Sequence, residues 1–306
     1  MRFTRNKLFI WQLHTRALEL GARTVVMGVL NVTPDSFSDG GLYLDTSRAV
    51  DHALKMLEKG ATVLDIGGES TRPSSKRTVS AAEEQDRVLP VIEGILRQRP
   101  EAILSIDTYK AATAAACLRA GVEIVNDVSG LLWDQAMAPL CAQTRCGVVL
   151  MHTRGKPEEW NSLPPLAAEQ VLPLIKRELA ERCEAAIAQG IAADNIVIDP
   201  GYGFGKQFDE NYALLARQKE LIPLGFPIMA GVSRKSFLRR TLGRRLTNTM
   251  REANQDLILA TAAASTAAVL AGAHIVRVHD VDTAAAAVVI ADELLATFHH
   301  QAESTL

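Results

Sequence analysis

Two basic residues near the C-terminal end of the chain, Arg277 and His279, stand two positions apart where an apolar run ends. Residues two apart in a β-strand point to the same side, so both side chains would face one ligand. A guanidinium and an imidazole in this arrangement favour a phosphate-like anion. A lone histidine is more often a hydrogen-bonded core residue, but its spacing from Arg277 favours the anion-binding interpretation.

Three residues with acceptor oxygens, Asp107, Asn126 and Asp199, each follow a short apolar run. An ionised carboxylate only accepts hydrogen bonds, whereas an amide both donates and accepts. One buried carboxylate could be a structural partner. Three such groups around a single cavity instead match a flat heterocycle whose edge carries several N–H donors and a carbonyl. We therefore expect these residues to bind a heterocyclic ring if the fold brings them together.

Two polar segments rich in turn-forming residues are candidate substrate loops. The first, residues 31–41, places Phe37 between carboxylates and ends in two glycines, which suits a lid that closes over a substrate. The second, residues 70–77, contains Thr71, Arg72 and Pro73. These supply a hydroxyl, a guanidinium suited to phosphate or carboxylate, and a restricted backbone. An ordinary solvated connection between a strand and a helix is the alternative for both segments.

The glycine-rich segment 199–206, DPGYGFGK, has neither the spacing of a Walker phosphate loop nor that of a dinucleotide-binding loop. We expect its glycines to allow tight turns while Phe204 packs against a flat ligand. No Ser-His-Asp order, HExxH motif or Cys/His metal cluster is present, which argues against nucleophilic hydrolysis and zinc chemistry. The metal expected is Mg²⁺, weakly held with Asn31 as the best-placed protein oxygen donor.

Short runs rich in Val, Ile and Leu would position these groups, because each is followed by a polar loop and then by helical periodicity. The runs span residues 25–30, 62–66, 102–106, 122–125, 147–151, 195–198, 226–230 and 274–278. Alternating strands and helices pair in parallel, and eight such units close a (β/α)8 TIM barrel. The alternative is an open doubly wound sheet. Almost every run ends in a charged or amide residue, and only a barrel brings all those ends to one mouth.

The chain is predicted to divide into an N-terminal extension (1–24), one α/β barrel (25–297) and a C-terminal tail (298–306). The extension is expected to add at most a strand or helix that covers the lower end of the barrel. Ser80 and Glu83 fit a helix capping box, and Gly60, Gly121, Gly190 and Gly272 stand where helices should end.

The composition excludes several classes of protein. With 33 basic and 35 acidic residues the formal charge is −2, so no overall field would attract nucleic acid or a membrane surface. The four cysteines lack paired spacing, which favours reduced thiols. No apolar run is long enough for a signal sequence or a membrane span, and we expect a cytoplasmic protein.

Taken in chain order, the motifs resemble those of the dihydropteroate synthase family. They are GVLNVTPDSFSDGG, LDIGGESTRP, SIDTYKA, VNDVSG, LMH, DPGYGFGK, GVSRKSF and RVHDV. Any one of these could arise by chance, but the whole series at barrel spacing is specific. The resemblance extends from Val25 to about Leu295. The chain departs from the family pattern after LMH and at Ser74, where glycine is common.

The resemblance implies a TIM barrel, usually dimeric, that joins p-aminobenzoate to 6-hydroxymethyl-7,8-dihydropterin diphosphate and releases diphosphate. Because the arylamine is a weak, neutral nucleophile, stabilisation of the leaving group should dominate, which predicts an SN1-like displacement. It assigns the pterin to Asp107, Asn126, Asp199 and Lys235, with Met151, Phe204 and Gly231 lining the slot. It assigns diphosphate and Mg²⁺ to Asn31, Arg72, Arg277 and His279. It assigns p-aminobenzoate, and the sulfonamides that compete with it, to Phe37, Thr71, Pro73 and Ser233.

Two other functions stay open. One is a pterin-barrel methyltransferase that acts on methyltetrahydrofolate and a corrinoid protein. The other is a catalytically inactive pterin-binding or scaffold protein. Neither has an evident need for both the Arg277 and His279 pair and the turn-rich segment 31–41.

Overall fold

Parallel strands form the centre of the protein, as the recurring apolar runs predict. The computed structural model describes residues 7–33, 41–69, 79–245 and 253–303. The strands of the central sheet are β3 (Val25–Asn31), β4 (Val63–Gly67), β5 (Ile103–Asp107), β6 (Ile124–Asp127), β7 (Gly147–Met151), β8 (Ile196–Asp199), β9 (Met229–Ala230) and β10 (Ile275–Val278). They pair in parallel in the order β8-β7-β6-β5-β4-β3-β10-β9.

A parallel bridge between Ile198 on β8 and Ile228, just before β9, joins the two outer strands of this order and closes the barrel. The (β/α)8 prediction is therefore confirmed, and the open doubly wound sheet is excluded. The seventh strand is shorter than the predicted run 226–230, because pairing with β10 begins only at Met229. Pro227 has no N–H to donate, although its carbonyl accepts the Ile198 N–H at 2.9 Å.

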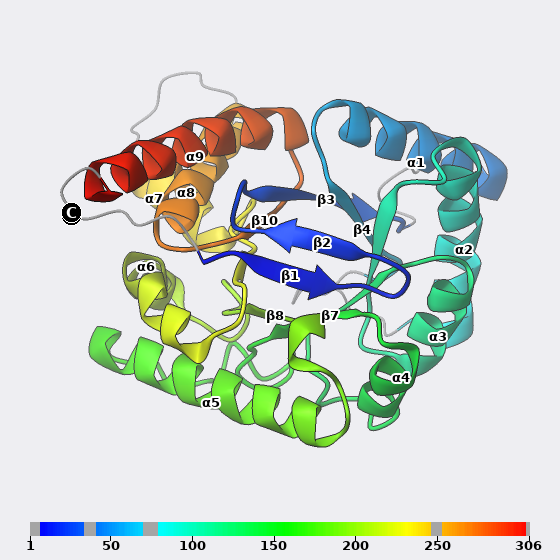
Figure 1. Cartoon of the computed structure of the whole chain (residues 1–306), viewed down its shortest axis with the longest axis horizontal. Coiled ribbons are helices and arrows are strands. Elements are labelled where there is room, and N and C mark those ends of the chain that lie inside the picture. Colours follow the sequence, from blue (N-terminus) through cyan, green and yellow to red (C-terminus); the bar gives the residue numbers. More distant parts are fainter. Residues whose placement is uncertain (1–6, 34–40, 70–78, 246–252, 304–306) are drawn as a thin grey trace.

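Helices surround the barrel on its outside (Figure 1). They are α1 (Gly41–Glu58), α2 (Ala81–Gln98), α3 (Ala111–Arg119), α4 (Met137–Thr144), α5 (Ala168–Ala188), α6 (Phe208–Arg217), α7 (Ser236–Arg245), α8 (Ala253–Leu270) and α9 (Val281–Glu303), with 3-10 turns at Ala193–Asn195 and Gln218–Leu224. Ser80 caps α2 by accepting the Glu83 N–H at 3.2 Å, which confirms that half of the predicted capping box. The four glycines predicted at helix ends all have positive φ, which favours glycine over other residues.

The N-terminal extension forms an antiparallel hairpin of β1 (Phe9–Gln12) and β2 (Ala17–Leu20), which lies across the barrel in Figure 1. Trp11 and Leu20 are fully buried and pack with Val25, Val63 and other residues near the amino ends of the barrel strands. The indole N–H of Trp11 donates to the Asn195 carbonyl at 2.7 Å. The hairpin thus covers the end of the barrel opposite the carboxyl ends of its strands.

The predicted boundary of a C-terminal tail at residue 298 falls inside α9, which runs to Glu303. The division of the chain into extension, barrel and tail stays a prediction. Among the described residues, no helix combines the length and apolar character that crossing a membrane requires.

Replacing Trp11 with alanine should lower the free energy of unfolding by about 3–5 kcal/mol, because a buried indole and its hydrogen bond are lost. Urea denaturation of the purified variant measures this. Ile10→Ala is the matched control, since Ile10 neighbours Trp11 but is 49% exposed, and it should cost less than about 1 kcal/mol. Equal losses in the two variants would show that the hairpin does not anchor the barrel.

Candidate active site

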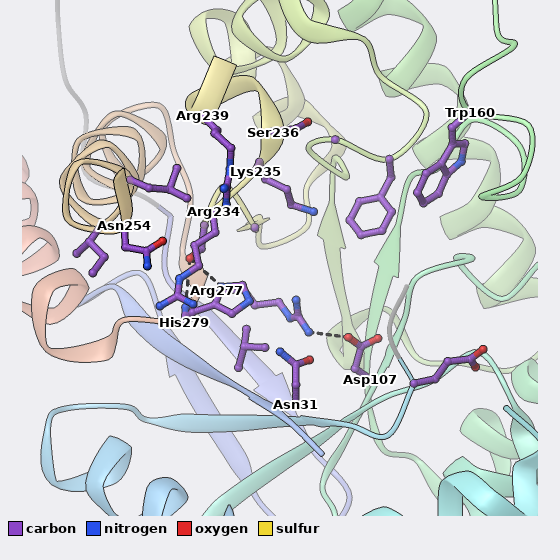
Figure 2. Close-up of a pocket in the computed structure, with 18 residues that line it drawn as sticks. Asn31, Asp107, Trp160, Arg234, Lys235, Ser236, Arg239, Asn254, Arg277 and His279 are labelled. Atoms are coloured by element: carbon purple, nitrogen blue, oxygen red, sulfur yellow. Dashed lines mark hydrogen bonds and ion pairs between the residues drawn. The ribbon is translucent and has the colours of Figure 1, made fainter. Parts of the chain in front are cut away.

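A cavity of about 770 Å³ lies at the carboxyl ends of the barrel strands (Figure 2). Its lining includes the predicted residues Asn31, Asp107, Phe204, Gly231, Ser233, Lys235, Arg277 and His279. A narrow recess shares Asp107, Phe204, Gly231, Lys235 and Arg277 with this cavity and adds the predicted Asn126, Met151 and Asp199. Phe37, Thr71, Arg72 and Pro73 lie outside the described residues. Every predicted site residue that the structure describes therefore lies at this one mouth.

The guanidinium of Arg277, on β10, joins carboxylates from two other strands. Its Nε donates to Asp65 Oδ2 and one of its terminal nitrogens donates to Asp107 Oδ2, each at 2.6 Å. Asp65 Oδ2 also accepts from Asn126 Nδ2 at 2.9 Å. Burial disfavours the charged guanidinium, but Asp65 and Asp107 outweigh that effect and raise the pKa of Arg277. Arg277 is thus a fixed cation, and part of its hydrogen-bonding capacity is already used.

Asp65 is the residue of this cluster that the sequence analysis left without a role. Its side chain is fully buried, and its Oδ1 has no hydrogen-bond partner among the described residues. A buried carboxylate is costly unless it is paired, so Arg277 and Asn126 are needed to keep it in place. The available signal was its position at the end of an apolar run, shared with Asp107 and Asp199.

Asp107 and Lys235 are both shifted toward neutrality in this site. Burial raises the pKa of Asp107 to about 7, with Arg277 opposing the shift and the charge of Asp65 adding to it. Burial, reinforced by Arg277, lowers the pKa of Lys235 to about 7, while the charges of Asp199 and Asp107 partly offset the shift. Near neutral pH each group can hold or lose a proton, which is typical of residues in catalytic clefts.

Asp199 and Lys235 also line the recess. Asp199 Oδ1 accepts the Gly201 N–H at 2.7 Å, and burial raises the pKa of its carboxyl group. The Lys235 ammonium lies 3.8 Å from the centre of the Phe204 ring, over its face. A Cβ at Gly231 would be in van der Waals contact with Asp199 Oδ2, at 3.6 Å, so a larger side chain there would cover this carboxylate. Glycine at this position leaves Asp199 facing the recess.

The glycine-rich segment after β8 is built around a buried lysine. Lys206 Nζ donates to the carbonyls of His152, Gly201 and Phe204, at 3.2, 2.8 and 3.2 Å. These contacts fix the turn, so Lys206 is not available as a phosphate ligand. The Phe204 ring, which lines the cavity, is held edge-to-face by Trp160, with ring centres 5.3 Å apart. The predicted tight turns are confirmed, because Gly201, Gly203 and Gly205 all have positive φ, whereas the packing of Phe204 against a flat ligand stays a prediction.

The rim of the cavity carries polar groups from the segments that follow β9 and β10 and from the start of α7. Ser233 Oγ lies 3.0 Å from His279 Nδ1 and accepts the His279 N–H at 3.2 Å. Ser236, the first residue of α7, and Arg239 also line the cavity, and neither was predicted (Figure 2). Their position at the start of a helix could have indicated such a role, because the amino end of a helix carries partial positive charge and favours an anion.

No group of three or more His, Cys, Asp or Glu side chains in the described part of the chain is arranged to hold a metal ion. Asn31 ends β3 and lines the cavity. A Cβ at Gly67 would be 3.9 Å from Asn31 Oδ1 and 3.7 Å from Asp107 Oδ2, so both oxygens lie close to the same backbone position. A site with only one or two protein oxygens suits Mg²⁺, because this ion commonly keeps several waters and binds substrate phosphates.

Comparison with known proteins agrees with this geometry. A family model described as pterin binding enzyme matches residues 27–279. A dihydropteroate synthase of Synechocystis is 38% identical over 274 residues, which cover 90% of this chain and 91% of that protein. A dihydropteroate synthase of Xanthomonas albilineans, solved with 4-aminobenzoic acid, has a TM-score of 0.83 and 38% identity, covering 94% of this chain and 98% of that one. A dihydropteroate synthase of Yersinia pestis in a sulfonamide complex has a TM-score of 0.83 and 38% identity, covering 94% of this chain and 100% of that one.

The barrel and its carboxylate-lined recess thus define an enzyme of the pterin-binding class. Within that class, the chain belongs to the dihydropteroate synthases, which are transferases of folate biosynthesis. The family resemblance read from the motifs is confirmed. The relatives named above support this family rather than the pterin-barrel methyltransferases.

The raised pKa of Asp107 gives a pH dependence to stability. The folded state binds the Asp107 proton more tightly than the unfolded chain, so this stabilisation is full below about pH 4 and is lost as pH rises through about 7. Asp107→Asn removes the titration. From pH 5 to pH 7.5, the free energy of unfolding of the variant should therefore rise relative to wild type by on the order of 1–2 kcal/mol.

Urea denaturation of both proteins at the two pH values checks this. Asp282→Asn is the control, because the Asp282 side chain is 58% exposed and its pKa is lowered by its hydrogen bond with Lys59. It should show no such rise. A difference between Asp107→Asn and wild type that does not change with pH would contradict the assignment.

Proposed function

We propose that the protein condenses 6-hydroxymethyl-7,8-dihydropterin diphosphate with p-aminobenzoate, giving 7,8-dihydropteroate and diphosphate. The observation that carries this proposal is a buried recess of carboxylate and amide groups that opens into a cavity with cationic side chains. The recess matches the donor-rich edge of a pterin, and the cations match a diphosphate leaving group. The X. albilineans relative solved with 4-aminobenzoic acid and another structure of that enzyme with 7,8-dihydropteroate support the choice of substrates.

The pterin binds in the recess. Asp199 and Asp107 accept from its ring N–H and amino groups, while the Asn126 amide can both donate and accept. Lys235 donates to the ring from the other side, and its ammonium is already held over Phe204. Met151 and Gly231 line the remaining walls of the slot.

The diphosphate lies at the rim, against Arg277 and His279, with Arg72 from the segment 70–78. The side-chain oxygen of Asn31 would hold Mg²⁺. When bound, the ion would neutralise charge on the diphosphate oxygens. Arg277 can serve the diphosphate only with the donors that Asp65 and Asp107 leave free. This division makes Arg277 the link between the ring and the leaving group.

The p-aminobenzoate lies above the pterin, among Phe37, Thr71, Pro73 and Ser233. Its carboxylate faces the amino end of α7, where Ser236 offers a hydroxyl and the helix presents the positive end of its dipole. The stem of Lys235 borders both substrates, so that its charge serves the pterin and its methylene groups serve the arylamine.

The reaction is an SN1-like displacement. The pterin C–O bond breaks first and its electron pair leaves with diphosphate, whose developing charge is stabilised by Arg277, His279 and Arg72. Asp107 and Asp199 stabilise the electron-poor pterin methylene group. The arylamine is a neutral, weak nucleophile, so its lone pair forms the C–N bond only after the leaving group has begun to depart, and its proton is then lost to solvent or to diphosphate. The proposal also includes that the enzyme is a homodimer and acts in the cytoplasm.

Diphosphate release on mixing the two substrates with Mg²⁺ tests this function. Release should equal dihydropteroate formed, should depend on p-aminobenzoate and should be strongly reduced without Mg²⁺. A protein that binds the pterin but releases no diphosphate would instead be an inactive binding protein. Methyl transfer from methyltetrahydrofolate without diphosphate release would favour the methyltransferase alternative.

A further inference from the structure

The Phe204 ring, which lines both the cavity and the narrow recess, contacts two other side chains of the site. The Lys235 ammonium lies 3.8 Å from the ring centre, over the ring face. The indole of Trp160 packs edge-to-face with the same ring, with ring centres 5.3 Å apart and planes at 88°. Trp160 also lines the cavity (Figure 2), but it is not one of the groups proposed to hold a substrate. The Phe204 ring therefore links Trp160 to a lysine that is proposed to bind the pterin.

The position of the Phe204 ring determines where the Lys235 ammonium lies. A Cβ at Gly203 would be 3.2 Å from Lys235 Cδ, so the stem of the lysine packs along the glycine-rich turn. Beyond that contact the ammonium meets the face of the Phe204 ring, which attracts a cation. If the ring rotated away, the ammonium would lose this contact, and its place beside the recess would no longer be fixed.

The backbone of Phe204 is fixed, but its ring needs a further restraint. The Phe204 N–H donates to the Gly201 carbonyl at 3.1 Å, and the Phe204 carbonyl accepts from Lys206 at 3.2 Å. Neither hydrogen bond restrains rotation about the bonds of the side chain. Phe204 is also partly exposed, so packing does not enclose the ring on all sides. The contact with Trp160 supplies the restraint, because aromatic pairs favour this edge-to-face geometry.

Trp160 is itself held in place. It is 7% exposed, and its indole N–H donates to the Gly155 carbonyl at 3.3 Å. The segment around it is joined at two points to Glu210, a buried residue of α6. Arg154, near the start of the segment, donates to Glu210 Oε2 at 3.3 Å, and the N–H of Leu166, near its end, donates to Oε1 at 2.7 Å. Trp160 can therefore orient a neighbouring ring.

We propose that Trp160 is a positioning residue for pterin binding, because its indole holds the Phe204 ring in place against the Lys235 ammonium. Trp160 acts on the ligand through Phe204 and Lys235, which line the recess. This inference rests on the proposed function for its ligand, a dihydropterin, but it does not depend on the release of diphosphate.

Calorimetric titration of 6-hydroxymethyl-7,8-dihydropterin into single and double variants tests the proposal. Trp160→Leu should weaken binding about fivefold, the effect of losing one aromatic pair. Phe204→Leu removes the ring that both Trp160 and Lys235 contact, and it should weaken binding about tenfold. The double variant should bind within about twofold of Phe204→Leu alone, because Trp160 then has no ring left to position.

Two further variants separate positioning from general stability. Trp160→Phe keeps an aromatic ring beside Phe204 and loses the hydrogen bond to Gly155, so its affinity should lie within about twofold of wild type. Trp133→Leu is the matched control. Trp133 also packs edge-to-face with an aromatic ring, that of Tyr109, at 5.2 Å between centres, but it lines a different cavity. This control should bind the dihydropterin as wild type does.

Trp160→Met, with a more flexible side chain that adapts to irregular space, is the second variant if circular dichroism shows that Trp160→Leu is unfolded. Wild-type affinity in either folded variant would overturn the proposal. Losses that multiply to about fiftyfold in the double variant would also overturn it, since Trp160 would then act independently of Phe204. An equal loss in Trp160→Phe and Trp160→Leu would do the same, because an aromatic ring would not be what matters.

The titrations also separate this inference from the proposed function. If wild type binds the dihydropterin but releases no diphosphate, the proposed reaction fails, while the variants still decide whether Trp160 positions the ring. A wild type that does not bind the dihydropterin would overturn both.

Discussion

The ion pairs of Arg277 with Asp65 and Asp107 are the constraint on which the rest of the site depends. Three strands, β10, β4 and β5, meet through one guanidinium with two 2.6 Å contacts. Asp65 is fully buried and Asp107 nearly so, hence neither carboxylate could be kept there without this cation. The barrel supplies the geometry, because only a closed sheet brings the ends of these strands to one mouth. Arg277 therefore belongs both to the recess proposed for the pterin and to the cavity proposed for the diphosphate.

The same cluster links binding to chemistry through charge. Arg277 opposes the shift that raises the pKa of Asp107 to about 7, and it contributes to the shift that lowers the pKa of Lys235 to about 7. In the proposed reaction the same guanidinium places a fixed positive charge beside the diphosphate leaving group, an arrangement that favours a dissociative displacement. The N-terminal hairpin packs into the opposite end of the barrel, so this part of the core and the active-site cavity lie at separate ends.

The sequence predicted the barrel and most of the site because both depend on local patterns. Apolar runs followed by polar residues mark the strand ends, and Arg277 with His279 follows the two-residue period of a strand. Asp65 was missed as a site residue because its role depends on partners 61 and 212 residues away, Asn126 and Arg277. Pairings across a barrel follow from strand register and packing, which one sequence does not specify. The shortened β9 shows the same limit, because a run ending in Met229 and Ala230 has strand composition even where pairing has not begun.

The central claim is that carboxylates at the strand ends bind the edge of the pterin. Asp199 tests it most directly, because its carboxylate is buried in the recess and lies outside the Arg277 ion pairs. Calorimetric titration of the dihydropterin substrate into wild type and Asp199→Asn measures the effect. The account predicts an affinity at least about tenfold weaker in the variant, equal to about 1.4 kcal/mol, with a folded protein by circular dichroism. An unchanged affinity in a folded variant would contradict the account, since the recess would then not be where the pterin binds.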